Sequence, residues 1–300
     1  MRVLVLGGDG MLGHKVVQVL ADRHEVTATF QSPRGAWTAF PMYEHAPAER
    51  TLGGVDAGAF DTVVRAFAAV RPEVVVNCVG IIKQLEEAND PIVALEVNAL
   101  FPHHLADLCG ACGARLIHMS TDCVFSGRKG HYTEGDVSDA EDLYGRTKYL
   151  GEVDRAGCLT IRTSIIGRDF LKQSALLEWF LARRGGTVQG YRNAVFSGLT
   201  TQALARIMGD LIGHHGDLRG VVQVASEPIT KLDLLRRIRD AMGLDVAIEP
   251  FDDPPCDRSL DASRFVTATG SHIPTWDEMV AELAADPTPY DDWRRRHAAV

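Results

Sequence analysis

Long apolar stretches and a secretory leader are both missing from the sequence. The longest strongly apolar stretch near the front, residues 74–82, is interrupted by Asn77. It is far shorter than the roughly 20 residues that a membrane-spanning helix needs. The first residues run directly into glycines and contain no small-residue cleavage site. We therefore expect a cytoplasmic protein with no membrane partner.

Cysteine is scarce and irregularly spaced. The six cysteines, at 78, 109, 112, 123, 158 and 256, do not form the dense pattern of a disulfide framework, so reduced thiols are expected. Cys109 and Cys112 have the spacing of a metal or redox pair, but no second Cys or His pair completes a zinc site. We interpret them as small residues near a helix end closed by Gly110 and Gly113, and predict no metal.

Basic charge is in deficit. The chain has 31 Lys and Arg against 40 Asp and Glu, a formal net charge of -9. Nucleic-acid-binding proteins usually concentrate basic residues on one face. The short arginine runs at 183–184 and 294–296 are expected to be solvated helix ends. Nucleic acid is therefore not an expected partner.

Strand-like and helix-like segments alternate from the first residue, which predicts an α/β fold with a doubly wound parallel sheet. The expected strands cover residues 2–6, 25–30, 74–78, 115–120 and 159–163. The expected helices cover residues 12–21, 60–70, 91–109 and 142–152. A sheet of this Rossmann type binds ligands at the carboxyl ends of its strands.

After about residue 163 the alternation loosens. The expected elements are helices at 174–184, 201–212, 231–242 and 276–284 and a strand at 221–224. We predict a Rossmann domain over residues 1–165 and a smaller C-terminal α/β substrate lobe over 166–300. Part of 190–226 is expected to return to the first domain. No repeat or low-complexity linker separates the two parts, so the lobe is expected to be woven onto the domain.

A glycine turn stands between the first predicted strand and the first predicted helix. Gly7 supplies the turn, Gly10 lets the backbone approach a pyrophosphate, and Gly13 lets the helix pack closely on the strand. The N–H groups at the helix start, including Met11 and Leu12, favour a negative ligand. An ordinary strand-to-helix turn is the alternative, but the position in a βαβ unit favours dinucleotide binding.

The residues after the second predicted strand bear on which dinucleotide binds. NAD sites usually have an Asp or Glu there, whereas this chain has Gln31 and Ser32, with Arg34 close behind. A 2′-phosphate would meet a cation and a hydroxyl, which favours NADP(H) over NAD(H), unless Arg34 is only an exposed loop residue. Asp56 could accept from the adenine amino group, with capping of the next helix as the alternative.

Tyr144 and Lys148 lie four residues apart, on one face of one predicted helix. Free tyrosine has a pKa of about 10, and a nearby cation stabilises its phenolate. Thr121, after the strand at 115–120, could donate to the same carbonyl oxygen as Tyr144. The alternatives are a half-buried tyrosine and a strand-end cap. Asn98 is expected either to contact Lys148 through water or to be a plain polar helix residue.

These residues together resemble the extended short-chain dehydrogenase/reductases, and within them the dTDP-4-dehydrorhamnose reductase family. Further matching segments are residues 76–80, 97–98, 120–127, 162–164 and 198–201. The resemblance implies that Thr121, Tyr144 and Lys148 are catalytic and that Asp122 touches the sugar. It also implies that the cofactor is lined by Cys78, Val79 and Gly80, with Lys148 holding its ribose.

Two departures from the family concern the substrate. The family commonly has Tyr and Trp where this chain has Cys123 and Ile165, which changes how a sugar ring or base would stack. Lys83 could bind a diphosphate, or it could be a solvated lysine. Asn193, in a Gly/Tyr/Asn segment of the second lobe, is a further candidate substrate contact.

The resemblance implies NADPH-dependent reduction of a keto carbon, at C4 of a nucleotide-linked 6-deoxy-4-keto hexose, in deoxysugar biosynthesis. An epimerase or dehydratase of the same superfamily is disfavoured, because no acid follows the second strand and Asp122 is followed by Cys123. A non-catalytic NADP-binding regulatory subunit is disfavoured by the retained Thr/Tyr/Lys set. The sugar, the base, the product stereochemistry and a homodimeric state stay open.

Overall fold

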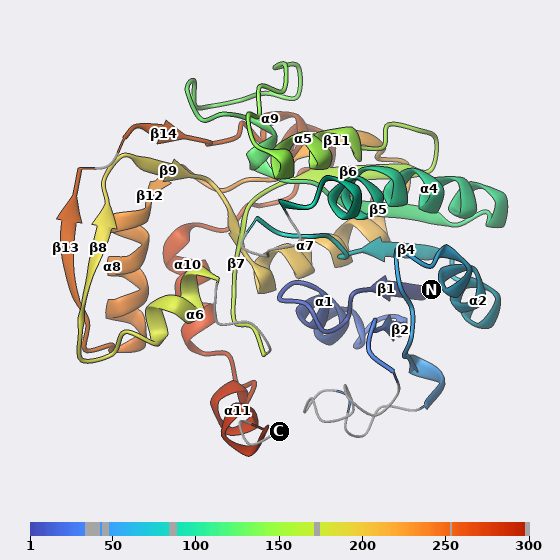
Figure 1. The fold of residues 1–300 in the computed structure, drawn as a ribbon, viewed down its shortest axis with the longest axis horizontal. Helices are drawn as coiled ribbons and strands as arrows, with labels where there is room; N and C mark the ends of the chain where they lie inside the picture. The colour runs from blue at the N-terminus through green and yellow to red at the C-terminus, as the bar shows by residue number, and fades with distance from the viewer. Residues whose placement is uncertain (34–42, 44–47, 84–88, 171–174, 253, 298–300) are drawn as a thin grey trace.

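A parallel sheet lies at the centre of the fold (Figure 1). The computed structural model describes residues 1–33, 43, 48–83, 89–170, 175–252 and 254–297. Within these residues, neighbouring strands of the sheet are all parallel. Their spatial order is β11 (Gly220–Gln223), β6 (Cys158–Arg162), β5 (Arg115–Met119), β4 (Val74–Asn77), β1 (Arg2–Leu6), β2 (Glu25–Thr29) and β3 (Thr51–Leu52).

Helices accompany the strands along the described chain. They are α1 (Gly13–Leu20), α2 (Phe60–Val70), α3 (Pro91–Ala94), α4 (Phe101–Cys112), α5 (Leu143–Leu150), α6 (Leu176–Leu181), α7 (Thr201–His214), α8 (Lys231–Met242), α9 (Ser263–Thr269), α10 (Trp276–Ala284) and α11 (Tyr290–His297). The helices predicted at 60–70, 231–242 and 276–284 have the predicted bounds.

Alternating side chains on each strand cover the two faces of the sheet. Val3 and Val5 of β1 pack with residues of α1 and α7, whereas Leu4 and Leu6 pack with residues of α2 and α4. Successive strand residues point to opposite faces, so a run of apolar residues needs helices on both sides. The predicted doubly wound Rossmann sheet is confirmed.

The strand order reverses beside β1. From β1 the chain continues to β2, toward one edge of the sheet, whereas from β4 it continues to β5, toward the opposite edge. In doubly wound sheets the crevice that binds ligands opens at this point, at the carboxyl ends of the strands. The glycine turn follows β1 directly, and the residues from Cys78 onward follow β4.

A smaller α/β lobe lies to one side of the sheet (Figure 1). It is joined to the Rossmann helices through α10, which packs on both α7 and α8. The short strands outside the main sheet are β7 (Ile165–Ile166), β8 (Thr187–Tyr191), β9 (Ala194–Phe196), β10 (Leu199–Thr200), β12 (Ile229–Thr230), β13 (Ala247–Phe251) and β14 (Cys256–Asp257). Most of these short strands carry no clear period in the sequence, and none was predicted.

The helix predicted over residues 91–109 is more complex than expected. Asp90 caps its start by accepting from the N–H groups of Ile92 and Val93. A π-helix then covers Leu95–Leu100 before α4 continues to Cys112. A π-helical turn adds one residue to the turn and redirects a side chain, and such turns are common at functional sites. Here the redirected residue is Asn98.

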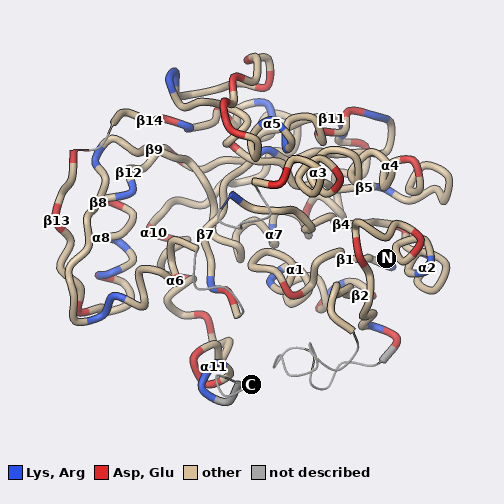
Figure 2. The backbone as a smooth tube through the Cα atoms, viewed as in Figure 1, with Lys and Arg blue, Asp and Glu red and all other residues tan. Residues whose placement is uncertain are grey.

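Charged residues of both signs are interspersed along the described chain (Figure 2). No described helix is long and apolar enough to span a membrane. Among the described residues no His, Cys, Asp and Glu cluster could hold a metal. Cys109 and Cys112 are free thiols at the end of α4, which Gly113 closes with φ +69°, whereas Gly110 lies inside the helix.

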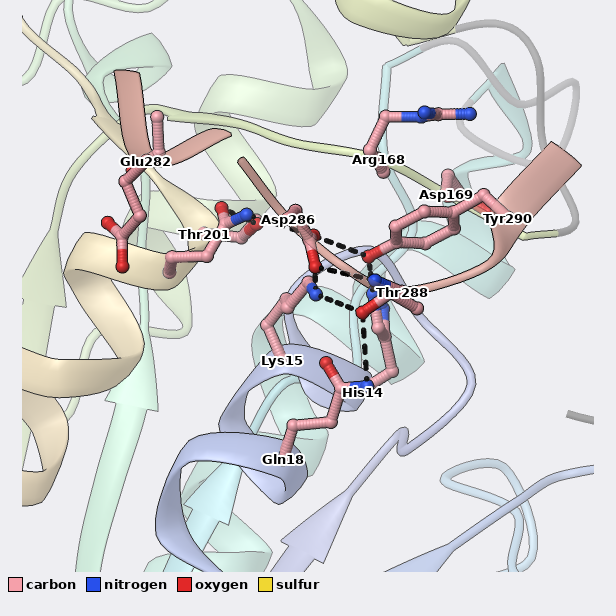
Figure 3. A network of polar contacts seen from close by, with 12 residues as sticks. His14, Lys15, Gln18, Arg168, Asp169, Thr201, Glu282, Asp286, Thr288 and Tyr290 are labelled. Atoms are coloured by element: carbon pink, nitrogen blue, oxygen red, sulfur yellow. Dashed lines mark hydrogen bonds and ion pairs between the residues drawn. The ribbon is translucent and has the colours of Figure 1, made fainter. Parts of the chain in front are cut away.

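The segment after α10 is tied to α1 by a buried ion pair (Figure 3). Lys15 Nζ lies 2.6 Å from Asp286 Oδ2, and the two side chains are 4% and 7% exposed. Burial opposes ionisation of Asp286, but hydrogen bonds from Lys15 and Thr288 hold the pKa of this carboxyl below its usual value. Burial lowers the Lys15 pKa as well, and its contacts with Asp286 oppose this, so each member of the pair favours the charged form of the other.

Removal of one partner of this pair should cost far more than removal of an exposed partner. We expect Asp286→Ala to lower the free energy of unfolding by about 3–5 kcal/mol, because Lys15 is left buried without its counter-ion. Asp61→Ala is the matched control, since its pair with Arg65 is 70% exposed on both sides, and it should cost less than about 1 kcal/mol. Urea unfolding measures both, and equal losses would contradict the expectation.

Candidate active site

The glycine turn after β1 is built on close backbone contacts. Gly7 has φ +79°, a conformation that favours glycine. A Cβ on Gly13 would overlap the carbonyl oxygen of Gly7. A Cβ on Gly7 would lie 3.2 Å from Val79 Cγ2 and 3.4 Å from the carbonyl carbon of Cys78. The structure therefore brings these four predicted cofactor residues together at the switch point of the sheet.

The middle of the turn is held by hydrogen bonds. Gly10 N donates to Gly7 O at 3.2 Å, and the Gly10 carbonyl accepts from His14 N at 3.2 Å and lies 2.8 Å from His14 Nδ1. Leu12 is buried in front of α1, whereas Met11 is partly exposed. The peptide groups from Gly10 to Gly13 thus have fixed orientations at a helix start, which suits an anionic ligand.

Arg34 and Asp56 are the two residues predicted to bind the adenosine part of the dinucleotide. Arg34 lies outside the described residues. The N-cap of α2 is Ala59, so Asp56 does not cap this helix. The Asp56 carboxylate instead accepts from Gly58 N through Oδ1 at 2.9 Å and from Gln31 Nε2 through Oδ2 at 3.1 Å. The capping alternative for Asp56 is therefore wrong. The contact with Gln31 places Asp56 beside the end of β2, where a ribose would lie in a Rossmann site.

Substitution at Gly13 should disturb this turn. We expect Gly13→Ala to lower the free energy of unfolding by about 1–3 kcal/mol, because the added methyl group overlaps backbone and not a flexible side chain. Gly110→Ala is the control, since it lies in α4 with no atom within 4 Å of the added carbon. It should stabilise the protein by about 0.5–1 kcal/mol. Opposite signs in chemical denaturation are the expected result.

Helix α5 carries Tyr144 and Lys148 and is packed closely at both ends. Asp142 caps it by accepting from Gly145 N at 2.8 Å. A Cβ on Gly145 would overlap the carbonyl oxygen of Cys123, and a Cβ on Gly151 would overlap that of Asn98. These contacts fix α5 between the loop after β5 and the π-helix.

A hydrogen bond joins Thr121, which follows β5, to Tyr144 in α5. Thr121 Oγ1 donates to Asp122 Oδ1 at 3.1 Å and accepts from Cys123 N at 3.1 Å, so it also caps the short turn that follows β5. Burial raises the pKa of the Tyr144 phenol, and a hydrogen bond with Thr121 opposes that rise. The predicted stabilisation of the Tyr144 phenolate by Lys148 stays a prediction. Tyr144 is a protonated phenol at neutral pH.

Lys148 is buried and points at the end of β5. Its Nζ donates to the carbonyl oxygen of Met119 at 2.6 Å. Burial lowers the Lys148 pKa to about 8, and the charge of Glu152 opposes this. Glu152, one helical turn further on, accepts from Ser120 Oγ and from Arg162 Nε, both at 2.7 Å. The sequence analysis missed this carboxylate, although its i+4 spacing from Lys148 is a usable signal.

Asn98 holds the loop after β4 directly. Its Oδ1 accepts from Ile81 N at 2.9 Å and its Nδ2 donates to Ile81 O at 3.0 Å. A Cβ on Gly80 would lie 3.4 Å from Asn98 Oδ1 and 3.8 Å from Lys148 Nζ. Asn98 is therefore not a plain polar helix residue, and both of its amide atoms already have protein partners. Gly80 leaves space in front of Lys148.

A cavity of about 380 Å³ adjoins the loop after β5. Lys83 and Arg258 line it, together with Cys123 and Asp142. Lys83 Nζ lies 2.7 Å from Asp142 Oδ2, so it is not simply a solvated lysine, and Arg258 Nε donates to Phe125 O at 2.8 Å. Arg258 was not predicted, because it comes from the far end of the chain and no local pattern marks it.

Two predicted substrate residues do not line this cavity. Asp122 is 5% exposed and bonded to Thr121, and burial raises the pKa of its carboxyl, although Arg258 opposes this. Asn193 lies in the turn between β8 and β9, where its carbonyl accepts from Cys256 N at 3.0 Å. The structure thus joins Thr121 to Tyr144 by a hydrogen bond and Lys148 to the end of β5, while Lys83, Cys123, Asp142 and Arg258 line the neighbouring cavity.

The fold is that of the extended short-chain dehydrogenase/reductases. The model of the RmlD substrate binding domain family matches residues 1–288. The chain belongs to this family, and the resemblance found in the sequence is confirmed.

Individual relatives match shorter stretches. The chain is 37% identical over 152 residues to a dTDP-4-dehydrorhamnose reductase of Streptomyces griseus, covering 50% of this chain and 43% of that protein. It is 31% identical over 187 residues to methionine adenosyltransferase 2 subunit beta of Pongo abelii, covering 60% and 52%. The chain thus spans about half the length of the curated relatives it matches.

Solved structures confirm the fold along nearly the whole chain. A dTDP-4-dehydrorhamnose reductase from Bacillus anthracis, in complex with NADP, superposes with a TM-score of 0.77 at 18% identity. The superposition covers 94% of this chain and 98% of that one. At this identity the likeness shows the architecture and leaves the chemistry to be argued from the residues.

Proposed function

We propose that the protein is an NADPH-dependent reductase of a nucleotide-linked keto sugar, most closely a 4-keto-6-deoxy hexose. The observation that supports the proposal is that Tyr144 is hydrogen-bonded to Thr121, directly after β5, while Lys148, one turn along the same helix, bonds to Met119 O at the end of β5. These groups stand next to a glycine turn that is shaped for a pyrophosphate. NADPH supplies the hydride when it is bound.

The residues around the turn fit a nicotinamide dinucleotide. Gly7 and Gly13 let the turn pack closely, so that the peptide N–H groups at the start of α1 could approach a pyrophosphate, and Lys148 would hold the nicotinamide ribose near Gly80. No Asp or Glu ends β2, where Gln31 and Ser32 stand instead. A 2′-phosphate would meet no repelling charge there, which supports NADP(H) over NAD(H).

Tyr144 would protonate the substrate oxygen. Its raised pKa keeps the proton on the phenol at neutral pH, so the residue is poised as an acid and not as a base. Thr121 would donate a second hydrogen bond to the same oxygen by turning its hydroxyl from Asp122. Lys148, charged below about pH 8, would stabilise the phenolate that remains.

The cavity beside Cys123 suits a phosphorylated group. Lys83 and Arg258 are cations from distant parts of the chain that face the same space, and a diphosphate could replace the Lys83 contact with Asp142. Asp122 and Asn193 stay candidates for sugar hydroxyls. Cys123 and Ile165, in place of aromatic residues, leave the sugar and base less tightly stacked, so the sugar specificity is expected to differ from that of a rhamnose reductase.

Turnover tests the proposal. We expect the wild type to oxidise NADPH with at least one member of a panel of nucleotide-linked keto sugars and not with the free sugars. Tyr144→Phe should lower kcat by about 100-fold or more while NADPH still binds, because the proton donor is lost. Tyr149→Phe, on the exposed side of the same helix, is the matched control and should keep wild-type turnover.

Other outcomes separate the alternatives. Equal inactivity of the wild type and Tyr144→Phe on the whole panel, with NADPH bound by both, would favour a non-catalytic regulatory subunit. The match to a protein named as a subunit makes this the second candidate. Release of tightly bound NAD on denaturation, with no NADPH consumption, would favour an epimerase or dehydratase.

The pH dependence should reveal Glu152. Lys148 is a cation only below its pKa of about 8, so activity should fall as pH rises through that value. Glu152→Gln removes a charge that raises this pKa, so the basic limb of kcat against pH should move to lower pH. Glu96→Gln, an exposed carboxylate in the π-helix, should leave the limb in place. Loss of amplitude with an unmoved limb would assign Glu152 a purely structural role.

A further inference from the structure

The segment after α10 packs on the first turn of α1, next to the glycine turn (Figure 3). Asp286, Thr288 and Tyr290 face His14 and Lys15 across this contact. Lys15 Nζ donates to Thr288 Oγ1 at 2.9 Å in addition to its ion pair with Asp286. The contact therefore joins the two ends of the described chain through buried polar groups.

His14 connects this contact to the glycine turn. Its Nδ1 lies 2.8 Å from Gly10 O, and its Nε2 lies 2.8 Å from the hydroxyl of Tyr290. A backbone carbonyl can only accept, so Nδ1 carries the proton. Burial lowers the His14 pKa to about 4, so the ring is neutral at ordinary pH and Nε2 accepts from Tyr290 at 2.8 Å, a shorter contact than the 3.4 Å from the same hydroxyl to Asp286 Oδ2. Hydrogen bonds thus run unbroken from Tyr290 to Gly10.

The bond to Gly10 O bears on phosphate binding. In a trans peptide the carbonyl of Gly10 and the N–H of Met11 point in opposite directions. His14 holds that carbonyl with both its backbone N–H and its ring. The Met11 N–H is consequently turned outward, at the helix start where an anion would bind. The His14 ring therefore adds a second hydrogen bond to the backbone bond that already orients this peptide.

Tyr290 is rigidly placed for this purpose. It is 2% exposed, and its ring centroid lies 4.5 Å from that of Phe170, with the Arg168 guanidinium 4.7 Å from the centroid. Phe170 also contacts the His14 ring edge-to-face, with centroids 5.3 Å apart. The ring of residue 290 is thus fixed by packing, and its hydroxyl fixes His14. Tyr290→Phe keeps the packing of the ring and removes only the hydroxyl, so it separates the two contributions.

We propose that Tyr290 acts through His14 as a positioning residue for the pyrophosphate-binding turn, so that the segment from Asp286 to Tyr290 supports the cofactor site. This inference rests on the proposed dinucleotide binding. It assigns a function to a buried imidazole and a buried phenol that the proposed chemical step does not use. It also gives a reason for the close packing of the C-terminal segment on α1.

Tyr290→Phe tests the proposal, with Tyr191→Phe as the matched control at a 40% exposed tyrosine in the other lobe. Fluorescence titration should show the Kd for NADPH rising about fivefold in Tyr290→Phe, as expected for one lost hydrogen bond, and unchanged in Tyr191→Phe. At saturating NADPH, kcat should stay at the wild-type value while the KM for NADPH rises. A loss in kcat alone, or no change in Kd, would overturn the proposal.

A second variant tests whether the effect passes through His14. His14→Asn keeps an amide donor near the Nδ1 position for Gly10 O and removes the acceptor for Tyr290. In that background Tyr290→Phe should have no further effect on the Kd, because the shared bond is already gone. Equal fivefold effects in both backgrounds would show that Tyr290 does not act through His14. The urea midpoint of every variant is measured to compare only folded protein.

Amide hydrogen exchange separates failure of this proposal from failure of the proposed function. If the wild type binds no NADPH, the dinucleotide proposal fails, but the ligand-free protein can still be compared with its variant. Tyr290→Phe should speed exchange in residues 7–13 and leave α8, in the other lobe, unchanged. Unchanged exchange in residues 7–13 would overturn the coupling whatever the ligand is.

Discussion

Direct backbone contact at three glycines determines where the candidate site lies. Gly13 lets α1 rest on the carbonyl of Gly7, while Gly145 and Gly151 let α5 rest on the carbonyls of Cys123 and Asn98. None of these contacts leaves room for a Cβ. Because backbone atoms have little freedom to adjust, the phosphate-binding turn and the helix with Tyr144 and Lys148 are held at fixed distances from the sheet.

Burial then sets the charge states of the groups in this frame. Tyr144 is kept protonated, and Lys148 is kept close to its own titration point by the opposing effects of burial and Glu152. Burial and the nearby charge of Lys148 hold the His118 pKa well below its usual value. The His118 ring is hydrogen-bonded to Asn77. His118 is therefore neutral at neutral pH, and Lys148 carries the positive charge at the end of β5.

The sequence predicts every strand of the sheet except β3, because most of these strands are short apolar runs between glycine or polar turns, whereas β3 is only the two residues Thr51–Leu52. The glycine turn, the Tyr144 and Lys148 pair and Thr121 are local patterns, so they too could be read without coordinates. The π-helix could not, because it arises from the bonds between Asn98 and Ile81, which are distant in sequence. Arg258 and Tyr290 reach the site region only through tertiary packing, and nothing in their local sequence indicates it.

The charge states of Tyr144 and Lys148 are those that the proposed reduction of a keto group requires. An enzyme that oxidises an alcohol needs a base, and a buried tyrosine can serve as one only if a cation pulls its pKa down toward neutrality. In the ligand-free structure Lys148 is bonded to Met119 O and burial raises the Tyr144 pKa, so the phenol holds its proton. A proton donor beside a hydroxyl donor stabilises the alkoxide that forms when a carbonyl receives hydride. In the proposed reduction Tyr144 would therefore begin as the proton donor and Thr121 as the second donor to the same oxygen.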